Sequence, residues 1–212
     1  MDSLVYEALQ EITTSLEKNK DFLTDLDKEI GDGDHGINMS RGFNAVMSKL
    51  NPDDNMDIST TLKTVAMTLL STIEGSSGSL YGNAFLKASA ITKDVSTITS
   101  SILCEMLTAR LTGIKERGKA SRGDKTIVDA LEPACDAFAF ALSTHQTCSQ
   151  CLSNAILAAG VGVEYTKSIA AKKGRVSYLG EKSIGHQDPG ATSILIILEA
   201  LHQVILRKEI VN

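Results

Sequence analysis

The chain is most informative at residues 27–38, which read DKEIGDGDHGIN. Asp27, Asp32 and Asp34 stand in D-x4-D-x-D spacing, and three interspersed glycines allow the backbone to turn tightly around one point. Carboxylates held so close together repel one another unless a cation neutralises them. Because hard oxygen ligands suit magnesium or calcium, these three aspartates are predicted metal ligands.

The helix predicted after Gly36 points its free N–H groups back at this loop, and such a helix start attracts anions. Carboxylates, a hard cation and a helix N-terminus together indicate a metal-bridged phosphate. Taken alone, these residues fit a solvated acidic turn equally well, since Asp and Gly are common in loops. An EF-hand calcium loop is excluded, because its twelfth position, counted from Asp32, needs an acid and is Phe43.

Outside the acidic loop, apolar residues recur at helical spacing over most of the chain. About eight helices are predicted, over residues 4–16, 37–50, 58–73, 80–91, 98–114, 124–142, 148–171 and 189–207. Asp124 is the expected N-cap of one of them, and Asp188 with Pro189 is expected to begin the last. Short connections favour antiparallel neighbours, so the fold class is all-α. By length, one large domain or two small ones are possible, and a single domain over residues 1–212 is expected.

Composition narrows the class of protein. With 42% hydrophobic residues the chain should form an ordinary globule, and the net charge of −5 leaves no basic footprint for direct nucleic-acid binding. Neither a signal peptide nor a membrane span is expected, and a cytoplasmic location follows. The Cys148-x-x-Cys151 spacing lacks a second pair, so these cysteines are expected to be small buried residues on a helix.

Three further segments carry polar and glycine residues. In Gly75-Ser76-Ser77-Gly78, backbone N–H groups and hydroxyls can wrap phosphate oxygens, although a plain turn between helices is the simpler interpretation. A basic link covers residues 117–126, and a long polar loop covers residues 174–188. Loops of that length are usually functional or disordered. The long loop offers Arg175 for phosphate charge, and His186 near the start of the last helix.

Together these segments resemble one family, the L subunit of dihydroxyacetone kinase. The resemblance lies in three stretches taken in the family's order: residues 27–39, the Gly123-Asp124-Lys125-Thr126 motif, and residues 174–191. It implies a closed barrel of eight antiparallel helices with the nucleotide site at one end. It also implies ADP as a cofactor, ATP as its phosphorylated form, and two Mg²⁺ ions.

The resemblance further implies roles for individual residues. Asp27, Asp32 and Asp34 would hold the metals and, with Arg175, carry the catalysis. The implied nucleotide contacts are His35, Gly36, Asn38, Ser76, Ser77, Gly118, Ile127, Arg175, Asp188, Pro189 and Gly190. Where the family often has Gly-Ala-Ser-Gly, this chain has Gly75-Ser76-Ser77-Gly78, which is a conservative change.

The family implies partners as well. A phosphohistidine M subunit of the phosphotransferase system would rephosphorylate bound ADP, and the phosphoryl group would pass to dihydroxyacetone on a K subunit. Two alternatives stay open: a directly ATP-dependent glycerone kinase domain, and a nucleotide-state-dependent partner of a transcription regulator. A fatty-acid kinase relative is disfavoured, because His35 stands where that family typically has Thr.

Overall fold

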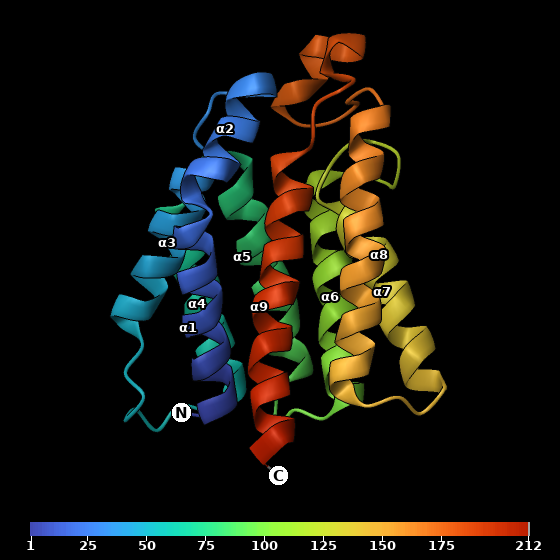
Figure 1. The fold of residues 1–212 in the computed structure, drawn as a ribbon. Coiled ribbons are helices and arrows are strands. Elements are labelled where there is room, and N and C mark those ends of the chain that lie inside the picture. The colour runs from blue at the N-terminus through green and yellow to red at the C-terminus, as the bar shows by residue number, and fades with distance from the viewer. Residues whose placement is uncertain (212) are drawn as a thin grey trace.

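The computed structural model describes residues 1–211, and within that range it contains nine α-helices, one 3-10 helix and no β-strand (Figure 1). The helices are α1 (Ser3–Lys18), α2 (Lys20–Ile30), α3 (His35–Lys49), α4 (Ile58–Thr72), α5 (Gly75–Ile91), α6 (Ser100–Gly118), α7 (Val128–Ser143), α8 (Cys148–Ser168), the 3-10 helix η1 (Arg175–Ser183) and α9 (Pro189–Val211).

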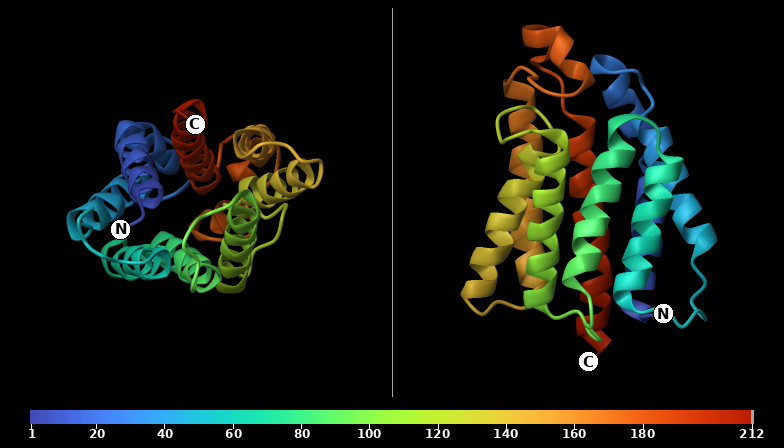
Figure 2. Two further views of the ribbon diagram at one scale, coloured as in Figure 1. Left: turned by 90° about the horizontal axis from the view of Figure 1, so that it is seen from below. Right: turned by 180° about the vertical axis from the view of Figure 1, so that it is seen from behind.

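Eight of these helices form a closed ring. Helix α1 packs on α3, each later helix from α3 to α9 packs on the next, and α9 returns to α1. Figure 2 shows the ring end-on, and Figure 1 shows that successive helices run in opposite directions. The predicted closed barrel of eight antiparallel helices is therefore confirmed, and α2 is an additional helix that lies across one end against α3 and α9.

Helix α2 was not among the predicted helices, and its composition explains the omission. Its buried positions are Leu23, Thr24, Asp27 and Ile30, so half of the face that it turns inward is polar. The apolar spacing that reveals an amphipathic helix is therefore incomplete. Because Asp27 belongs to this short helix, the acidic motif begins on a helix and continues into a loop.

Two predicted boundaries are wrong. The sixth ring helix, α7, begins at Val128, not at Asp124, because Gly123 and Lys125 adopt positive φ and cannot continue a helix. The Asp124 carboxylate instead accepts the N–H of Ser121 within the connection, at 2.8 Å.

Residues 75–78 likewise do not separate two helices. They form the first turn of α5, which begins at Gly75. The long loop at residues 174–188 is mostly the 3-10 helix η1. Cys148 and Cys151 lie in the first turn of α8, as predicted for helical residues. Cys151 is fully buried as predicted, whereas Cys148 is only partly buried.

Helix α9 is both long and apolar. Its stretch from Pro189 to Glu209 has the length and hydropathy of a membrane span, with a mean hydropathy of 1.5. However, 56% of that window is buried against other parts of the chain, which is the pattern of a helix that contributes to a protein core. Residues 193–197, which include three β-branched isoleucines, lie within this helix, as predicted from the helical spacing of residues 189–207.

The alternation of helix direction determines where the motifs meet. Helices α3, α5, α7 and α9 all begin at one end of the ring, where α1, α4, α6 and α8 end. The connections at this end are residues 31–34, 73–74, 119–127 and 169–188. These connections hold or adjoin every polar motif that the sequence assigned to the nucleotide site.

Candidate functional site

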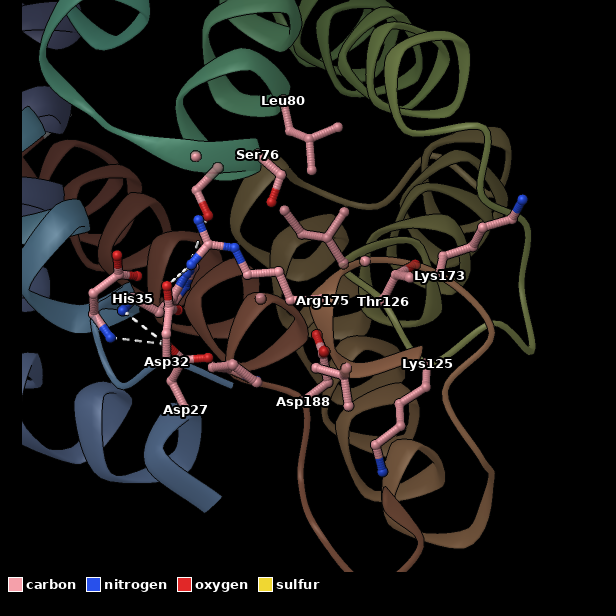
Figure 3. A pocket seen from close by; sticks show the side chains of 18 of the residues that line it. Asp27, Asp32, His35, Ser76, Leu80, Lys125, Thr126, Lys173, Arg175 and Asp188 are labelled. Carbon is pink, nitrogen blue, oxygen red and sulfur yellow. Dashed lines mark hydrogen bonds and ion pairs between the residues drawn. The ribbon is translucent and has the colours of Figure 1, made fainter. Parts of the chain in front are cut away.

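A pocket opens at this end of the ring, and Figure 3 shows the side chains that surround it. Its lining comes from five regions: the acidic loop, the start of α5, the α6–α7 connection, η1, and the start of α9. The lining residues are Asp27, Asp32, Asp34, His35, Glu74, Gly75, Ser76, Ser77, Leu80, Tyr81, Lys125, Thr126, Ile127, Lys173, Gly174, Arg175, Val176, Asp188, Pro189 and Gly190.

Four helix starts surround the pocket. His35 begins α3, Gly75 begins α5, Ile127 precedes the first residue of α7, and Pro189 begins α9. The N-cap residues of α3, α5 and α7 make no side-chain capping hydrogen bond, although Asp27 accepts the N–H of His35 at the start of α3. Helix N-termini carry a partial positive charge and free N–H groups, so this arrangement favours an anionic ligand such as a phosphate.

The acidic cluster lies against these helix starts. Carboxylate oxygens of Asp27, Asp32 and Asp34 all come within 4.8 Å of one another, with Asp27 buried, Asp34 partly buried and Asp32 exposed. The donor set is entirely hard oxygen, as magnesium prefers. The side chains therefore fit the predicted metal site, with the open side toward the pocket.

Asp27 also organises the loop that follows it. Its Oδ2 accepts the main-chain N–H groups of Asp34 at 2.9 Å and His35 at 3.1 Å. Gly31 allows this close approach, because a Cβ at that position would lie 2.1 Å from Asp27 Oδ1. Gly33 supplies the left-handed turn, with φ of 72°. One carboxylate thus holds the loop and faces the other two.

Arg175 brings positive charge to the cluster. Its guanidinium forms an ion pair with Asp32, as Figure 3 shows. The same guanidinium lies beside the start of α5, since a Cβ on Gly75 would be 3.4 Å from Arg175 Nη2. Arg175 therefore stands between the predicted metal ligands and the predicted phosphate turn.

A buried hydrogen-bond chain supports the phosphate turn from behind. Ser193 Oγ donates to Gly190 O at 2.8 Å, so it is left to accept from its other two neighbours. These are Tyr81 Oη at 2.7 Å and His35 Nε2 at 3.0 Å. Nδ1 of the same imidazole then carries the lone pair that accepts from the Ser77 hydroxyl at 3.3 Å.

Burial keeps the titratable side chains of this hydrogen-bond chain, His35 and Tyr81, uncharged. Burial lowers the pKa of His35 to about 4, although Asp27 opposes the shift, so the imidazole is neutral at pH 7. Burial also raises the pKa of Tyr81 well above its usual range. The neutral chain orients Ser77 without adding charge to the site.

Asp188 caps the last helix from inside the site. Its Oδ2 accepts the N–H of Ala191 at 2.7 Å, which confirms the predicted N-cap. Burial raises the pKa of Asp188 to about 7, while the hydrogen bond from Ala191 and the charge of Lys125 oppose that shift. Near neutral pH, the charge of this carboxylate therefore depends on what lies in the pocket.

Most of the predicted site residues come together here. The pocket lining includes Asp27, Asp32, Asp34, His35, Ser76, Ser77, Ile127, Arg175, Asp188, Pro189 and Gly190. Three others lie just outside the described lining. Gly36 packs on the main chain of α2, Asn38 is buried and accepts from Arg41 at 2.7 Å, and Gly118 ends α6. Nucleotide contacts by these three stay predictions.

The structure adds residues to which the sequence had assigned no role. Tyr81 and Ser193 belong to the buried chain, and Lys125, Thr126 and Lys173 line the pocket. Tyr81 and Ser193 lie within apolar helical patterns, so nothing local distinguished them from core residues. Lys125 belongs to a recognised motif, but only the folded chain shows what its ammonium contacts.

Known proteins resemble this chain over nearly its whole length. The DAK2 domain family matches residues 29–203. The ADP-binding subunit DhaL of the PEP-dependent dihydroxyacetone kinase of Escherichia coli (strain K12) is 41% identical over 181 residues, covering 85% of this chain and 86% of its own. A second relative is the ADP-binding subunit DhaL of the PTS-dependent dihydroxyacetone kinase of Lactococcus lactis subsp. lactis (strain IL1403). It is 40% identical over 199 residues, which cover 94% of this chain and 95% of the relative.

A solved structure agrees with the fold. The dihydroxyacetone kinase from C. freundii in complex with AMP-PNP and Mg²⁺ superposes with a TM-score of 0.72 at 25% identity. The match covers 96% of this chain but only 34% of the C. freundii chain, so this chain resembles one part of that longer kinase.

Proposed function

The chain belongs to the DAK2 domain family, and we propose that it is the ADP-binding, phosphoryl-transferring L subunit of a phosphotransferase-system-dependent dihydroxyacetone kinase. One observation carries this proposal: three carboxylates and the starts of four ring helices converge on a single pocket. Such a pocket suits a magnesium-bound nucleotide, because it offers hard ligands to the cation and N–H groups to the phosphates.

Asp27, Asp32 and Asp34 would hold the metal in this proposal. Two Mg²⁺ ions are proposed, since the family resemblance implies two and the three carboxylates would provide six oxygen atoms to hold them. When bound, the cations supply charge neutralisation to the phosphates. Asp27 has a second task, because its hydrogen bonds to the main chain of Asp34 and His35 keep the loop in shape.

The remaining residues position the nucleotide. Ser76 and Ser77, in the uncapped first turn of α5, would donate to phosphate oxygens. Arg175 would leave Asp32 when a cation arrives there and would then contact a phosphate. The start of α9 at Pro189 would lie against the nucleotide from the opposite side of the pocket. Phosphoryl transfer needs this positioning and charge neutralisation more than it needs a protein nucleophile.

Two partner proteins follow from this role. A phosphohistidine M subunit would donate the phosphoryl group to bound ADP, and a K subunit would present dihydroxyacetone as the acceptor. Both would have to reach the open end of the pocket. The exposed Tyr178 and Ile184, on and beside η1, are candidate contacts at this end. A cytoplasmic location fits a subunit that exchanges phosphoryl groups with these partners.

The nucleotide that accompanies the protein tests the proposal. The protein would be purified without added nucleotide and denatured, and the released compounds identified by chromatography and mass spectrometry. About one ADP per chain, resistant to exchange with labelled ATP, is the expected result. An empty site that exchanges ATP freely would favour a directly ATP-dependent kinase. Absence of any adenine nucleotide, even with magnesium added, would contradict the proposal.

The metal ligands need a separate test. Asp32→Ala should abolish magnesium-dependent retention of ADP, as measured by isothermal titration calorimetry. Asp25→Asn is the matched control, because Asp25 is an exposed carboxylate on α2 that pairs with Lys28. Normal magnesium-dependent binding by Asp32→Ala would refute the metal assignment. Docking of the nucleotide-bound form on a transcription regulator is a distinct proposal, tested by a pull-down with and without ADP.

A further inference from the structure

Lys125 is a lysine whose side chain is almost completely buried, with 1% of its surface exposed. Its ammonium donates to the main-chain carbonyls of Thr166 at 2.7 Å, Ser183 at 2.7 Å and His186 at 2.5 Å. The carbonyl of Ile169 lies at 3.4 Å. An ammonium has three N–H donors, so the three short contacts satisfy it completely.

The carbonyl cage lies at the end of α8. The last carbonyls of a helix have no partner within the helix and carry a partial negative charge. Lys125 therefore neutralises a helix terminus and satisfies its carbonyls at the same time. Burial lowers the pKa of Lys125, and the neighbouring Asp188 carboxylate opposes that shift. Figure 3 shows the Lys125 side chain directed away from the pocket, so its ammonium does not face the predicted nucleotide site.

The cage closes both ends of one segment. Residues 169–187 leave α8, pass through η1 and return to α9, and the caged carbonyls come from the two ends of this excursion. Other hydrogen bonds gather at the same place: Ala171 N–H to Ser183 Oγ, Gly185 N–H to Lys167 O, and Asp188 N–H to Thr166 Oγ1. The segment is therefore a loop fastened at its base.

The fastened segment carries Arg175 into the site. Arg175 begins η1, and Asp188 follows directly after the caged base of the loop. The cage atoms belong to the last turn of α8 and to connections at the pocket end of the ring, and none belongs to the apolar core cluster. Loss of the ammonium should therefore loosen the pocket wall more than the barrel.

We propose that Lys125 is a positioning residue for nucleotide binding: its caged ammonium fixes residues 169–187 so that Arg175 and the turn at 188–190 face the phosphates. This inference rests on the proposed function, because it assigns Lys125 to the nucleotide site named there. Its contribution is geometric, since its ammonium is directed away from the pocket and is satisfied by the carbonyls.

Two variants test the role of the ammonium. Lys125→Met removes the charge and keeps the length of the chain, whereas Lys125→Ala leaves a channel that n-propylammonium can fill. Lys172→Met is the matched control, because Lys172 is an exposed lysine of the same segment and does not line the pocket. Affinity for ADP with magnesium is measured by calorimetry for each protein, and folding by helical circular dichroism.

We expect both Lys125 variants to keep their helical signal and to bind ADP at least about tenfold more weakly, while Lys172→Met binds as the parent does. Added n-propylammonium should restore affinity in Lys125→Ala but not in Lys125→Met, and neutral 1-propanol should restore neither. Trypsin should cleave the Lys125 variants faster after residues 172, 173, 175 and 182, even without nucleotide.

Other outcomes would overturn the inference. ADP affinity equal to that of Lys172→Met, together with trypsin cleavage equal to that of the parent protein, would show that the cage does not position the site. Failure of both Lys125 variants to fold would make Lys125 a determinant of the whole barrel instead. Equal rescue by 1-propanol would show that filling the channel matters and the charge does not. Absence of ADP binding by the parent protein would refute the proposed function itself, a failure that is recognisable because it precedes any substitution.

Discussion

The guanidinium of Arg175 forms an ion pair with the carboxylate of Asp32 and so joins η1 to the acidic loop. Both side chains are about half exposed, at 54% and 42%, so the pair adds little to folding stability. A cation on Asp32 would compete with the guanidinium for the same oxygen atoms. Metal binding and the release of Arg175 toward a phosphate are therefore expected to occur together.

The first prediction concerns Arg175→Ala. We expect phosphoryl transfer to slow by about ten- to a thousandfold, because a positive charge near the phosphates is lost. The unfolding free energy should hardly change. Arg122→Ala is the control, since Arg122 is exposed on the α6–α7 connection and does not line the pocket. The measurement is the rate of phosphoryl transfer in the presence of both partner subunits. An unchanged rate in Arg175→Ala would show that the charge of Arg175 does not assist the transfer.

The second prediction concerns the pH dependence of stability. Asp188 has a pKa of about 7 when folded, against an ordinary value of 3.8. The folded state thus holds a proton that the unfolded chain releases near pH 4. This group stabilises the fold at low pH, and the contribution is lost as pH rises from about 4 through 7. The unfolding free energy of Asp188→Asn minus that of the parent should therefore be about 2–3 kcal/mol larger at pH 8 than at pH 5.

Urea unfolding in EDTA at both pH values gives the measurement. The contribution of His35 to the unfolding free energy changes with pH in the opposite direction. Burial lowers its pKa to about 4, so this contribution is lost as pH falls from about 6.5 through 4. The two groups largely cancel in the parent protein over that window. The difference between the parent and Asp188→Asn isolates the carboxylate, and an identical difference at pH 5 and pH 8 would disprove its buried titration.

The third prediction concerns the buried chain behind Ser77. Tyr81→Phe removes the hydroxyl that donates to Ser193 and should destabilise the protein by about 1–2 kcal/mol. Affinity for ADP should fall with it, because the orientation of His35 and Ser77 depends on that chain. Tyr178→Phe is the control, since Tyr178 is 75% exposed. Chemical denaturation and calorimetry would detect both effects, and equal behaviour of the two variants would show the chain to be dispensable.

The fourth prediction compares two glycines of α8. A Cβ at Gly162 would lie 2.0 Å from the carbonyl oxygen of Asp129, so α8 could not pack as closely on α7. Gly162→Ala should therefore cost about 1–3 kcal/mol or more. At Gly160 no atom lies within 4 Å of the added Cβ, and Gly160→Ala should stabilise the helix by up to about 1 kcal/mol. Thermal unfolding of both variants checks the contrast, which would fail if Gly162→Ala were as stable as Gly160→Ala.

Local signals in the sequence were strong where residue type and spacing act together. The acidic motif, the Asp188-Pro189 helix start and the apolar spacing of the ring helices were all recognisable. Local signals were weak where polar residues of the site lie on the buried face of a helix or in a turn with positive φ. Helix α2 was missed because polar Thr24 and Asp27 interrupt its buried face, and the start of α7 was misplaced because Lys125 adopts positive φ.

By itself, the sequence determined the helical class, the family resemblance and the residue types of the site, because periodicity, caps and acidic spacing are local properties of a chain. Only the tertiary structure decided which atoms meet. Arg175 reaches Asp32, Tyr81 reaches Ser193, and Lys125 reaches carbonyls 41 to 61 residues further along the chain. Contacts of that kind depend on the alternating direction of the ring helices, which gathers distant connections at one end.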